Sequence, residues 1–455
     1  MKTLRNVWSM MVVFLLSGGF LIGCSNDSDT TTPKRPVVFV HGFSGSASQF
    51  ESQAQRFIIN GYPAANLAAY EHNTGTGAPS PDNQIDGLDE VIDTVLAQTG
   101  QKNVDLICHS RGTRVCSSYL NSSAGRAAKV AHYVAVDAGG GLPTGGVPTL
   151  ALWGDLSVYE EGNPARSITG ATHIMDTTQA HIELATSAAS FARMYKFFND
   201  ADASRSDIVS ESGANVTIAG RALYFPENVG APGTLKIYEL NRNTGFRISD
   251  TPSFSQTIVD DGKWGSFSIK KDVAYEFAFE HSGGGKHHFY REPFTRSNYF
   301  ARLLTSRPGS GLGVILTKSD NHTDILVSRD KEIWGDQGVN NDILIIDGIN
   351  AATTQVAYRA KRLSGLFLLD WGADKGSILT TPDQVTDLST PISIFHSQAF
   401  MSGLDLYMPA ALTPNRTIAC WLIPRSGNGK TQWVNVPNWA SSDIRVTVNF
   451  RDCVY

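Results

Sequence analysis

A serine at residue 110 stands in the sequence context that is typical of an acyl-transfer nucleophile. The apolar run Val104–Cys108 leads into the motif Cys-His-Ser-Arg-Gly, and a helical pattern continues from there through Leu120. A serine at such a strand-to-helix turn has a strained backbone, so the residues two before and two after it must be small. Gly112 meets this requirement, and Cys108 replaces the glycine that usually stands first. The spacing predicts that Ser110 is a nucleophile.

A second motif, further upstream, has the composition of an oxyanion-binding loop. The apolar run Val37–Val40 is followed directly by His41–Phe43. Acyl transfer passes through a tetrahedral oxyanion, and each fixed backbone N–H aimed at it contributes about 3 kcal/mol. We expect the amides of Phe43 and Arg111 to be these two donors. His41 stands beside the first glycine of the loop, so we interpret it as a structural residue.

Three histidines between Ser110 and residue 203 could act as the general base. The chain order in folds of this type is nucleophile, acid, histidine, so the base comes late. His132 lies within an apolar strand pattern and is interpreted as a core or strand-end residue. His173 and His181 both lie in the predicted loop before the last helix of this region. We choose His181 because it directly precedes that helix, and we interpret His173 as a buried hydrogen-bonding residue.

Two aspartates could be the acid that orients the histidine. Asp137 ends the strand pattern Val130–Val136 and enters a glycine-rich loop, whereas Asp155 follows the strand pattern Thr149–Trp153. Either carboxylate could hold the imidazole in the required tautomer and stabilise the imidazolium. Residue type and spacing alone leave the choice open, with a slight preference for Asp155.

The elements that must position these residues change in character near residue 203. Before it, apolar strands alternate with helices such as Ile85–Thr99, which predicts a parallel α/β sheet covered on both faces. After it, short alternating strands between turn residues predict an all-β region. We divide the chain into an α/β catalytic domain at 36–203, a β-sandwich-like domain at 204–290 and a β-rich domain at 291–455. The strands expected after residue 203 include 215–219, 234–240, 266–269, 274–280, 313–317, 342–346, 417–423 and 445–450.

The first 24 residues have the pattern of an export signal. Lys2 and Arg5 precede a short apolar run, and the segment ends in Leu-Ile-Gly-Cys. This ending resembles the bacterial lipobox, in which the cysteine, here Cys24, becomes the lipidated first residue; an ordinary signal peptide that contains a cysteine is the alternative. The polar residues 25–35 are expected to form a linker. We expect an exported bacterial lipoprotein, held by Cys24 at the outer membrane or cell surface.

Charge and motif content exclude several classes of ligand. The formal net charge of -5 argues against nucleic acid as a partner. The sequence has no phosphate-binding loop or dinucleotide motif, so we expect no cofactor. The adjacent residues His287 and His288 would point to opposite faces of a strand, so we interpret them as surface residues and expect no metal. The sequence says nothing about protein partners.

Residues 36–199 resemble the lipases of the α/β-hydrolase superfamily. The resemblance rests on the nucleophile motif, on Val-His-Gly at 40–42, on Val-Ala-His-Tyr at 130–133 and on the segment 180–187 around His181. With its all-β C-terminal part, the chain is most similar to two-domain archaeal alkaline lipases, in which a β-barrel domain follows the hydrolase domain. The resemblance implies that Asp137 is the acid. It departs at Thr113, where small secreted lipases carry a second glycine.

The resemblance implies a serine hydrolase that cleaves carboxylic esters of lipids, as a triacylglycerol lipase or carboxylesterase. Ser110, His181 and Asp137 would form its catalytic triad, and an acyl-enzyme would be the intermediate. Two kinds of alternative stay open. The same triad also serves a thioesterase, an amidase or a polyester depolymerase, and the domain could instead be a non-catalytic lipoprotein that binds lipid.

Overall fold

A six-stranded parallel sheet carries the predicted motifs. The computed structural model describes residues 34–75, 77–154, 167–375, 386–388, 392–425 and 430–452, so the signal segment, Cys24 and Asp155 lie outside the described residues. The strands follow the order β2–β1–β3–β4–β5–β6. Their bounds are β1 Val37–Val40, β2 Leu67–Tyr70, β3 Val104–His109, β4 Val130–Val136, β5 Thr149–Trp153 and β6 Thr172–Met175. The helices are α1 Glu51–Ile59, α2 Ile85–Thr99, α3 Arg111–Ser122, α4 Ala124–Ala128, α6 Glu183–Thr186 and α7 Ala188–Asn199.

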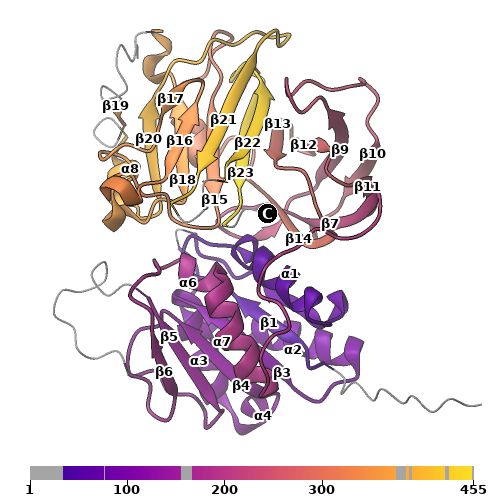
Figure 1. The fold of residues 1–455 in the computed structure, drawn as a ribbon, viewed down its shortest axis with the longest axis vertical. Coiled ribbons are helices and arrows are strands. Elements are labelled where there is room, and N and C mark those ends of the chain that lie inside the picture. The colour runs from indigo at the N-terminus through magenta and orange to yellow at the C-terminus, as the bar shows by residue number, and fades with distance from the viewer. Residues whose placement is uncertain are drawn as a thin grey trace, which may run out of the picture. The chain divides into compact units, whose positions relative to one another are not determined.

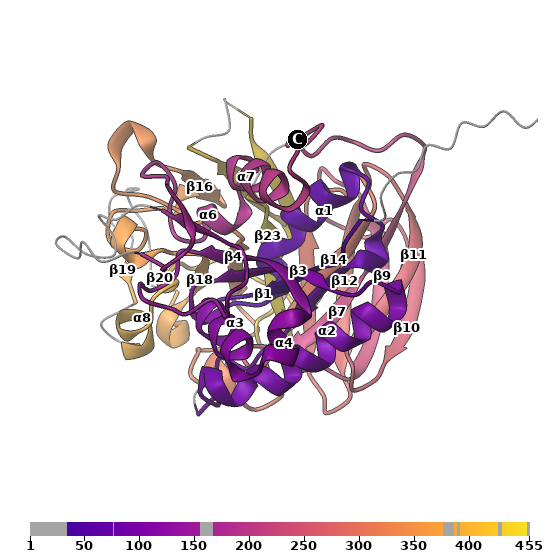
Figure 2. The ribbon, with the colours of Figure 1, turned by 90° about the horizontal axis from the view of Figure 1, so that it is seen from below.

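Helices cover both faces of this sheet, as Figure 2 shows for α1 and α7 on one side and α2 and α3 on the other. Successive strand residues point to opposite faces, so Phe39 packs with α1 and α7 whereas Val38 packs with α2 and α3. All four residues of β1 are fully buried. A strand buried on both faces reads as a continuous apolar run, and this explains why the sequence pattern predicted the sheet.

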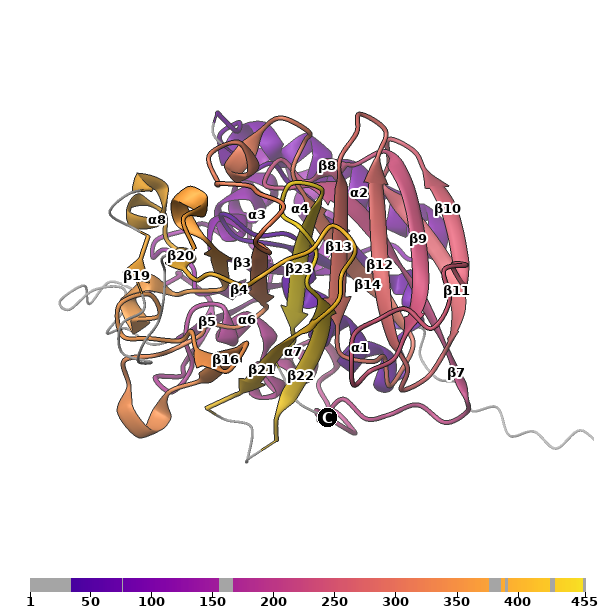
Figure 3. The ribbon, with the colours of Figure 1, turned by 90° about the horizontal axis from the view of Figure 1, so that it is seen from above.

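The chain after residue 203 forms three further sheets of mostly antiparallel strands (Figures 1 and 3). The nine-stranded sheet has the order β10–β9–β12–β13–β23–β15–β18–β20–β19, with β9 Gly233–Leu240, β10 Phe254–Ile258, β12 Ala274–His281, β13 Lys286–Arg291, β15 Ile325–Arg329, β18 Gly365–Leu369, β19 Thr386–Asp387, β20 Met401–Asp405 and β23 Ile444–Phe450. A second sheet holds β7 Asn215–Tyr224, β8 Val229–Gly230, β11 Lys263–Lys270 and β14 Asn298–Thr305. The third holds β16 Ile343–Ile346, β17 Ile349–Asn350, β21 Thr417–Ile423 and β22 Gln432–Pro437, and the short helix α8 spans Ser393–Ser397.

Buried polar contacts join this β region to the hydrolase sheet. The carboxylate of Glu51 on α1 is held by Arg291 and accepts a hydrogen bond from Asn298 Nδ2 at 2.6 Å. Arg302 on β14 donates to Glu71 at 2.6 Å. Residues from Lys34 onward form one compact unit. The bounds proposed above for separate domains stay a prediction, and β13 pairs with β23 across the predicted divide at 290/291.

The predicted α/β pattern followed by an all-β region is confirmed, although some elements differ. The strand expected at 313–317 is wrong, because the chain forms a 3-10 helix at Gly311–Val314 and Gly311 has a positive φ of 67°. Two strands of the parallel sheet, β2 and β6, were not predicted. In the described part of the chain, no helix combines the length and the hydropathy that a membrane crossing requires.

Candidate active site

Ser110 lies at the tip of a sharp turn between β3 and α3. Its backbone has φ 51° and ψ -121°, a conformation that non-glycine residues rarely adopt and that persists only where the surroundings impose it. Neighbouring glycines allow the close approach: a Cβ on Gly42 would lie 2.9 Å from the Cβ of Ser110, and one on Gly112 would lie 2.5 Å from the backbone oxygen of His41. The predicted need for small residues around Ser110 therefore has a steric cause in the fold.

Asp137 and His181 lie side by side, 44 residues apart in the sequence. Asp137 directly follows β4, and its Oδ2 accepts a hydrogen bond from His181 Nδ1 at 2.6 Å. The other carboxylate oxygen accepts from the amide of Gly154 at 3.2 Å, which fixes the carboxylate at both atoms. Both side chains are buried. With Nδ1 as the donor, Nε2 is the acceptor nitrogen of the neutral ring, as proton removal from a serine requires.

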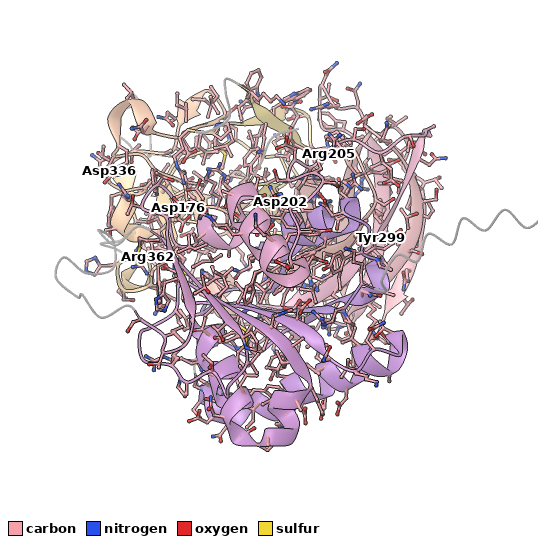
Figure 4. The ribbon with its side chains drawn as sticks, turned by 60° about the horizontal axis from the view of Figure 1, so that its bottom comes forward. Asp176, Asp202, Arg205, Tyr299, Asp336 and Arg362 are labelled. Atoms are coloured by element: carbon pink, nitrogen blue, oxygen red, sulfur yellow. A yellow bond between two sulfur atoms is a disulfide. The ribbon has the colours of Figure 1, made fainter. Side chains whose placement is uncertain are left out.

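The other candidates have different partners or lie outside the described residues. His173 is not the buried loop residue that we expected: it lies exposed on β6, and its Nε2 contacts the backbone oxygen of Ile168 at 3.0 Å. Asp155 lies outside the described residues. Asp176, labelled in Figure 4, also follows a strand of the sheet, but Arg193 Nη1 donates to its carboxylate at 2.9 Å. Among the carboxylates at this edge, the structure brings Asp137 to His181.

His109 fixes the backbone that carries His181. Its Nε2 donates to the backbone oxygen of His181 at 3.0 Å, and its Nδ1 accepts from Gln49 Nε2 at 2.9 Å. Burial is the main cause that lowers the pKa of His109 well below its usual value, and the neighbouring His181 lowers it further. A neutral His109 is therefore a positioning residue, which agrees with its predicted structural role.

The loop after β1 is held in place from both regions of the chain. His41 Nδ1 donates to the backbone oxygen of Gly42 at 2.9 Å, and burial lowers its pKa to about 4. Asn228, between β7 and β8, donates to the backbone oxygens of Gly45 at 2.8 Å and His72 at 3.0 Å. This loop carries Phe43, whose side chain is exposed. Its predicted partner Arg111 is the first residue of α3, where backbone N–H groups have no partner within the helix.

A carboxylate from the β region binds the segment that follows His181. Glu332 Oε1 accepts from the amide of Ile182 at 2.5 Å, and Oε2 accepts from the amide of Glu183 at 3.1 Å. Lys331 and Arg425 form ion pairs with the carboxylate of Glu183 at 2.5 and 2.8 Å. Burial raises the pKa of Glu332 above its usual value, while the amide donors and the nearby His181 oppose this rise.

A disulfide joins Cys108 at the end of β3 to Cys116 in α3. The sequence left open whether these two cysteines would be bonded. The bond spans Ser110 and ties the strand before the turn to the helix after it. Cys420 carries a buried free thiol, and Cys453 lies outside the described residues.

A cavity of about 760 Å³ opens beside these residues. Phe43, His109 and His181 contribute to its wall from the hydrolase part, and the β region contributes most of the rest. The side chains from the β region are mainly apolar, such as Leu304 on β14 and Phe367 on β18. The site thus combines a buried, hydrogen-bonded histidine with an apolar space of the size that a lipid chain needs.

The family models identify the chain. Residues 34–128 match the model for lipase (class 2), and residues 214–308 match the model for the lipase C-terminal domain. This chain is an α/β-hydrolase of the lipase family. A further model of a C-terminal domain matches residues 311–454. The resemblance to lipases with a C-terminal domain is therefore confirmed, and the family assignment makes this lipase-family protein a lipid hydrolase.

Other comparisons place this lipase-family chain among more distant proteins. Over 95 residues it is 26% identical to lysosomal thioesterase PPT2-B from Xenopus laevis, a match of 21% of this chain that spans only 33% of that protein. Lipase B from Aspergillus fumigatus shares 14% identity with a TM-score of 0.30, over 38% of this chain and 54% of that one. Phospholipase PlaB from Legionella pneumophila shares 10% with a TM-score of 0.28, over 61% and 97%. Such low scores carry no argument about fold or activity.

One interpretation of the lipase-family sequence was wrong. His287 and His288 are both buried, not on the surface. His287 lies between Thr447 Oγ1 at 2.8 Å and Thr305 Oγ1 at 3.0 Å, so both of its ring nitrogens have hydroxyl partners. Within the described ranges, no group of three His, Cys, Asp or Glu side chains is arranged to hold a metal ion.

Proposed function

We propose that this protein hydrolyses carboxylic esters of lipids through a Ser-His-Asp triad and an acyl-enzyme. Ser110 is the nucleophile, His181 the general base and Asp137 the acid. One observation carries the proposal: the buried contact of 2.6 Å between Asp137 Oδ2 and His181 Nδ1, beside a serine in the strained conformation of a strand-to-helix turn. A structural ion pair alone would not require the strained serine.

In the proposed reaction, His181 Nε2 takes the hydroxyl proton as Ser110 Oγ attacks the ester carbonyl carbon. The carbonyl oxygen becomes an oxyanion and accepts hydrogen bonds from the amides of Phe43 and Arg111. The ester C–O bond then breaks, and the imidazolium returns its proton to the leaving alcohol. Water, deprotonated by His181, attacks the acyl-enzyme and releases the carboxylic acid together with free Ser110. Asp137 stabilises the imidazolium in both halves of this cycle.

The cavity supports lipid esters as the substrates. Its apolar wall can bury an acyl chain, and each buried CH₂ group contributes about 0.8 kcal/mol. Hydrolysis of a p-nitrophenyl ester series from acetate to palmitate, with triolein beside it, tests the proposal. We expect kcat/KM to rise with chain length to at least eight carbons. Activity confined to acetate and butyrate would contradict a lipid substrate.

A thioester substrate is the second candidate, because the match to a thioesterase covers 95 residues. A thioester passes through the same tetrahedral oxyanion and the same acyl-enzyme. Palmitoyl thioesters and palmitoyl oxygen esters of matched leaving group separate the two. A kcat/KM for the thioester that exceeds the oxygen-ester value by more than about a hundredfold would favour the second candidate.

Membrane attachment through Cys24 is also part of the proposal. A lipidated cysteine would hold the enzyme where water-insoluble esters gather, and residues 25–35 would link the anchor to the fold. Incorporation of a labelled fatty acid tests it directly. Cys24→Ala should abolish the label and move the protein from the membrane fraction, whereas an unlabelled wild-type protein would exclude the anchor and the outer-membrane location with it.

A further inference from the structure

The cavity beside His181 has a charged residue in its mainly apolar wall. Strand β23 alternates between two environments: Ile444, Val446 and Val448 belong to the apolar core on one face of the nine-stranded sheet. Arg445 and Thr447 lie on the opposite face, and both contribute to the cavity wall. The guanidinium packs against the 3-10 helix at Gly311–Val314, since a Cβ on Gly313 would lie 2.7 Å from its Nη2.

Arg445 differs from the other arginines of this cavity in having no acidic partner. Arg302 donates to Glu71 at 2.6 Å, and Arg329 pairs with Asp342 at 2.9 Å. Within the part of the chain that the structure describes, no hydrogen bond or ion pair reaches the side chain of Arg445. It is only partly exposed, and burial lowers its pKa. A charge that is removed from water without a partner is unfavourable, and a ligand anion would remove this penalty.

The surroundings of Arg445 add positive charge and neutral donors. Lys318 also contributes to the cavity wall, and burial together with Arg445 lowers the pKa of its amine. Burial and the same arginine lower the pKa of His281 to about 4, so this imidazole adds no charge at neutral pH. The nearest acid, Asp324, contacts His322 at 3.2 Å and only partly offsets Lys318. An anion that enters this part of the cavity would meet attraction from both Arg445 and Lys318.

We infer that Arg445 is the centre of an anion-binding subsite, and that the cavity accepts an amphiphile whose phosphate or carboxylate head binds there. The hydrocarbon part would lie against Leu304, Leu312 and Phe367. A guanidinium suits such a head because it can donate two parallel hydrogen bonds to a phosphate or carboxylate. The inference rests on the proposed function where it names anionic lipid esters as substrates, but binding at Arg445 requires no hydrolysis.

Binding of decyl phosphate and of decanol, both below micelle formation, tests the subsite by calorimetry on the wild-type protein. The two ligands share one alkyl chain and differ in the anionic head. We expect decyl phosphate to bind at least about tenfold more tightly, since hydrogen bonds to a charged group contribute about 1.5–3 kcal/mol. Arg445→Gln should reduce this preference to about twofold or less. A preference that Arg445→Gln leaves unchanged, or no preference in the wild type, overturns the inference.

Further arms separate the remaining explanations. Gly313→Ala introduces a Cβ that must displace the guanidinium and should weaken decyl phosphate binding even if Arg445→Gln folds poorly. Lys102→Gln removes one positive charge from an exposed loop and should leave the preference unchanged. Inorganic phosphate should bind far more weakly than decyl phosphate; equal affinity would mean a free anion and overturn the lipid assignment. Ser110→Ala should bind decyl phosphate like the wild type, so a failure of hydrolysis leaves this result standing.

Discussion

Glu332 binds the backbone that directly follows His181, although it lies 150 residues further along the chain. Its carboxylate accepts the amide of Ile182 at 2.5 Å and is buried completely. The β region therefore positions the proposed general base as well as forming the cavity wall. Glu332 touches neither the base nor the nucleophile through a printed hydrogen bond, so we treat it as a positioning residue.

Replacing Glu332 tests this relationship. In Glu332→Gln one carboxylate oxygen becomes an NH₂ group that faces a backbone donor, so the segment after His181 must shift. We expect kcat to fall about 10- to 100-fold with a smaller change in KM, because small misplacements of a catalytic group have effects of this size. The acidic limb of the kcat/KM profile should also move to lower pH, since a nearby carboxylate favours the imidazolium. Glu280→Gln on β12 is the control, and an unmoved pH profile would mean a merely structural role.

The choice between two acids gives a second prediction. Asp137→Asn should lower kcat by about 10⁴-fold, because the amide would no longer hold the imidazole in the accepting tautomer or stabilise its charge. Steady-state kinetics on one p-nitrophenyl ester measures the effect, with Asp176→Asn as the matched control at the same edge of the sheet. If Asp155→Asn abolishes activity while Asp137→Asn does not, the role belongs to Asp155.

Buried neutral histidines predict a loss of stability in acid. Burial lowers the pKa of His41 to about 4 and that of His72 to about 3, both below the ordinary value of 6.5. Between about pH 4 and 6.5 the unfolded chain therefore binds more protons than the folded protein, so the free energy of unfolding falls as the pH falls through this window. Each such histidine contributes up to about 1.4 kcal/mol per pH unit. Urea unfolding across this range measures the slope.

His72→Gln separates this effect from general acid sensitivity. The variant should show a shallower slope by up to one proton, because it removes one group that must stay neutral. Gln at the exposed position of His396 serves as the comparison. An unchanged slope in His72→Gln would show that this histidine is not held neutral in the fold.

The disulfide around the nucleophile predicts a stability effect. Cys108 and Cys116 are 8 residues apart, and closing so short a loop restricts the unfolded chain by about 2–3 kcal/mol. Thermal unfolding of Cys108→Ala/Cys116→Ala should show a loss of this size, and dithiothreitol should reproduce it in the wild type. An equal effect of dithiothreitol on the double variant would attribute the loss to another thiol.

Sequence reasoning succeeded where burial leaves a local pattern. The runs at β1, β3 and β4 are apolar along their whole length because helices cover both faces of the sheet, and the turn at Ser110 carries its own steric signature. Strand β6 was missed because Thr172–Met175 is mostly exposed at the sheet edge and so lacks an apolar pattern. Resemblance, and not spacing, selected Asp137 over Asp155.

The missed site residues share a different cause. Glu332 and Asn228 act on loops that lie 150 and 187 residues away, and no local pattern marks such a contact. His287 was misread because alternation along one strand does not reveal that a second sheet covers its other face, where Thr305 meets the ring. Contacts between the β region and the hydrolase sheet had to be seen in the fold.

Labelling with a fluorophosphonate probe tests the central claim most directly. The probe forms a covalent bond with an activated serine, so the intact mass of the wild-type protein should rise by one adduct, and peptide mapping should place that adduct on Ser110. Ser110→Ala should stay unlabelled, and His181→Ala should label far more slowly. Labelling that persists in Ser110→Ala, or a folded wild-type protein that does not react, would contradict the account.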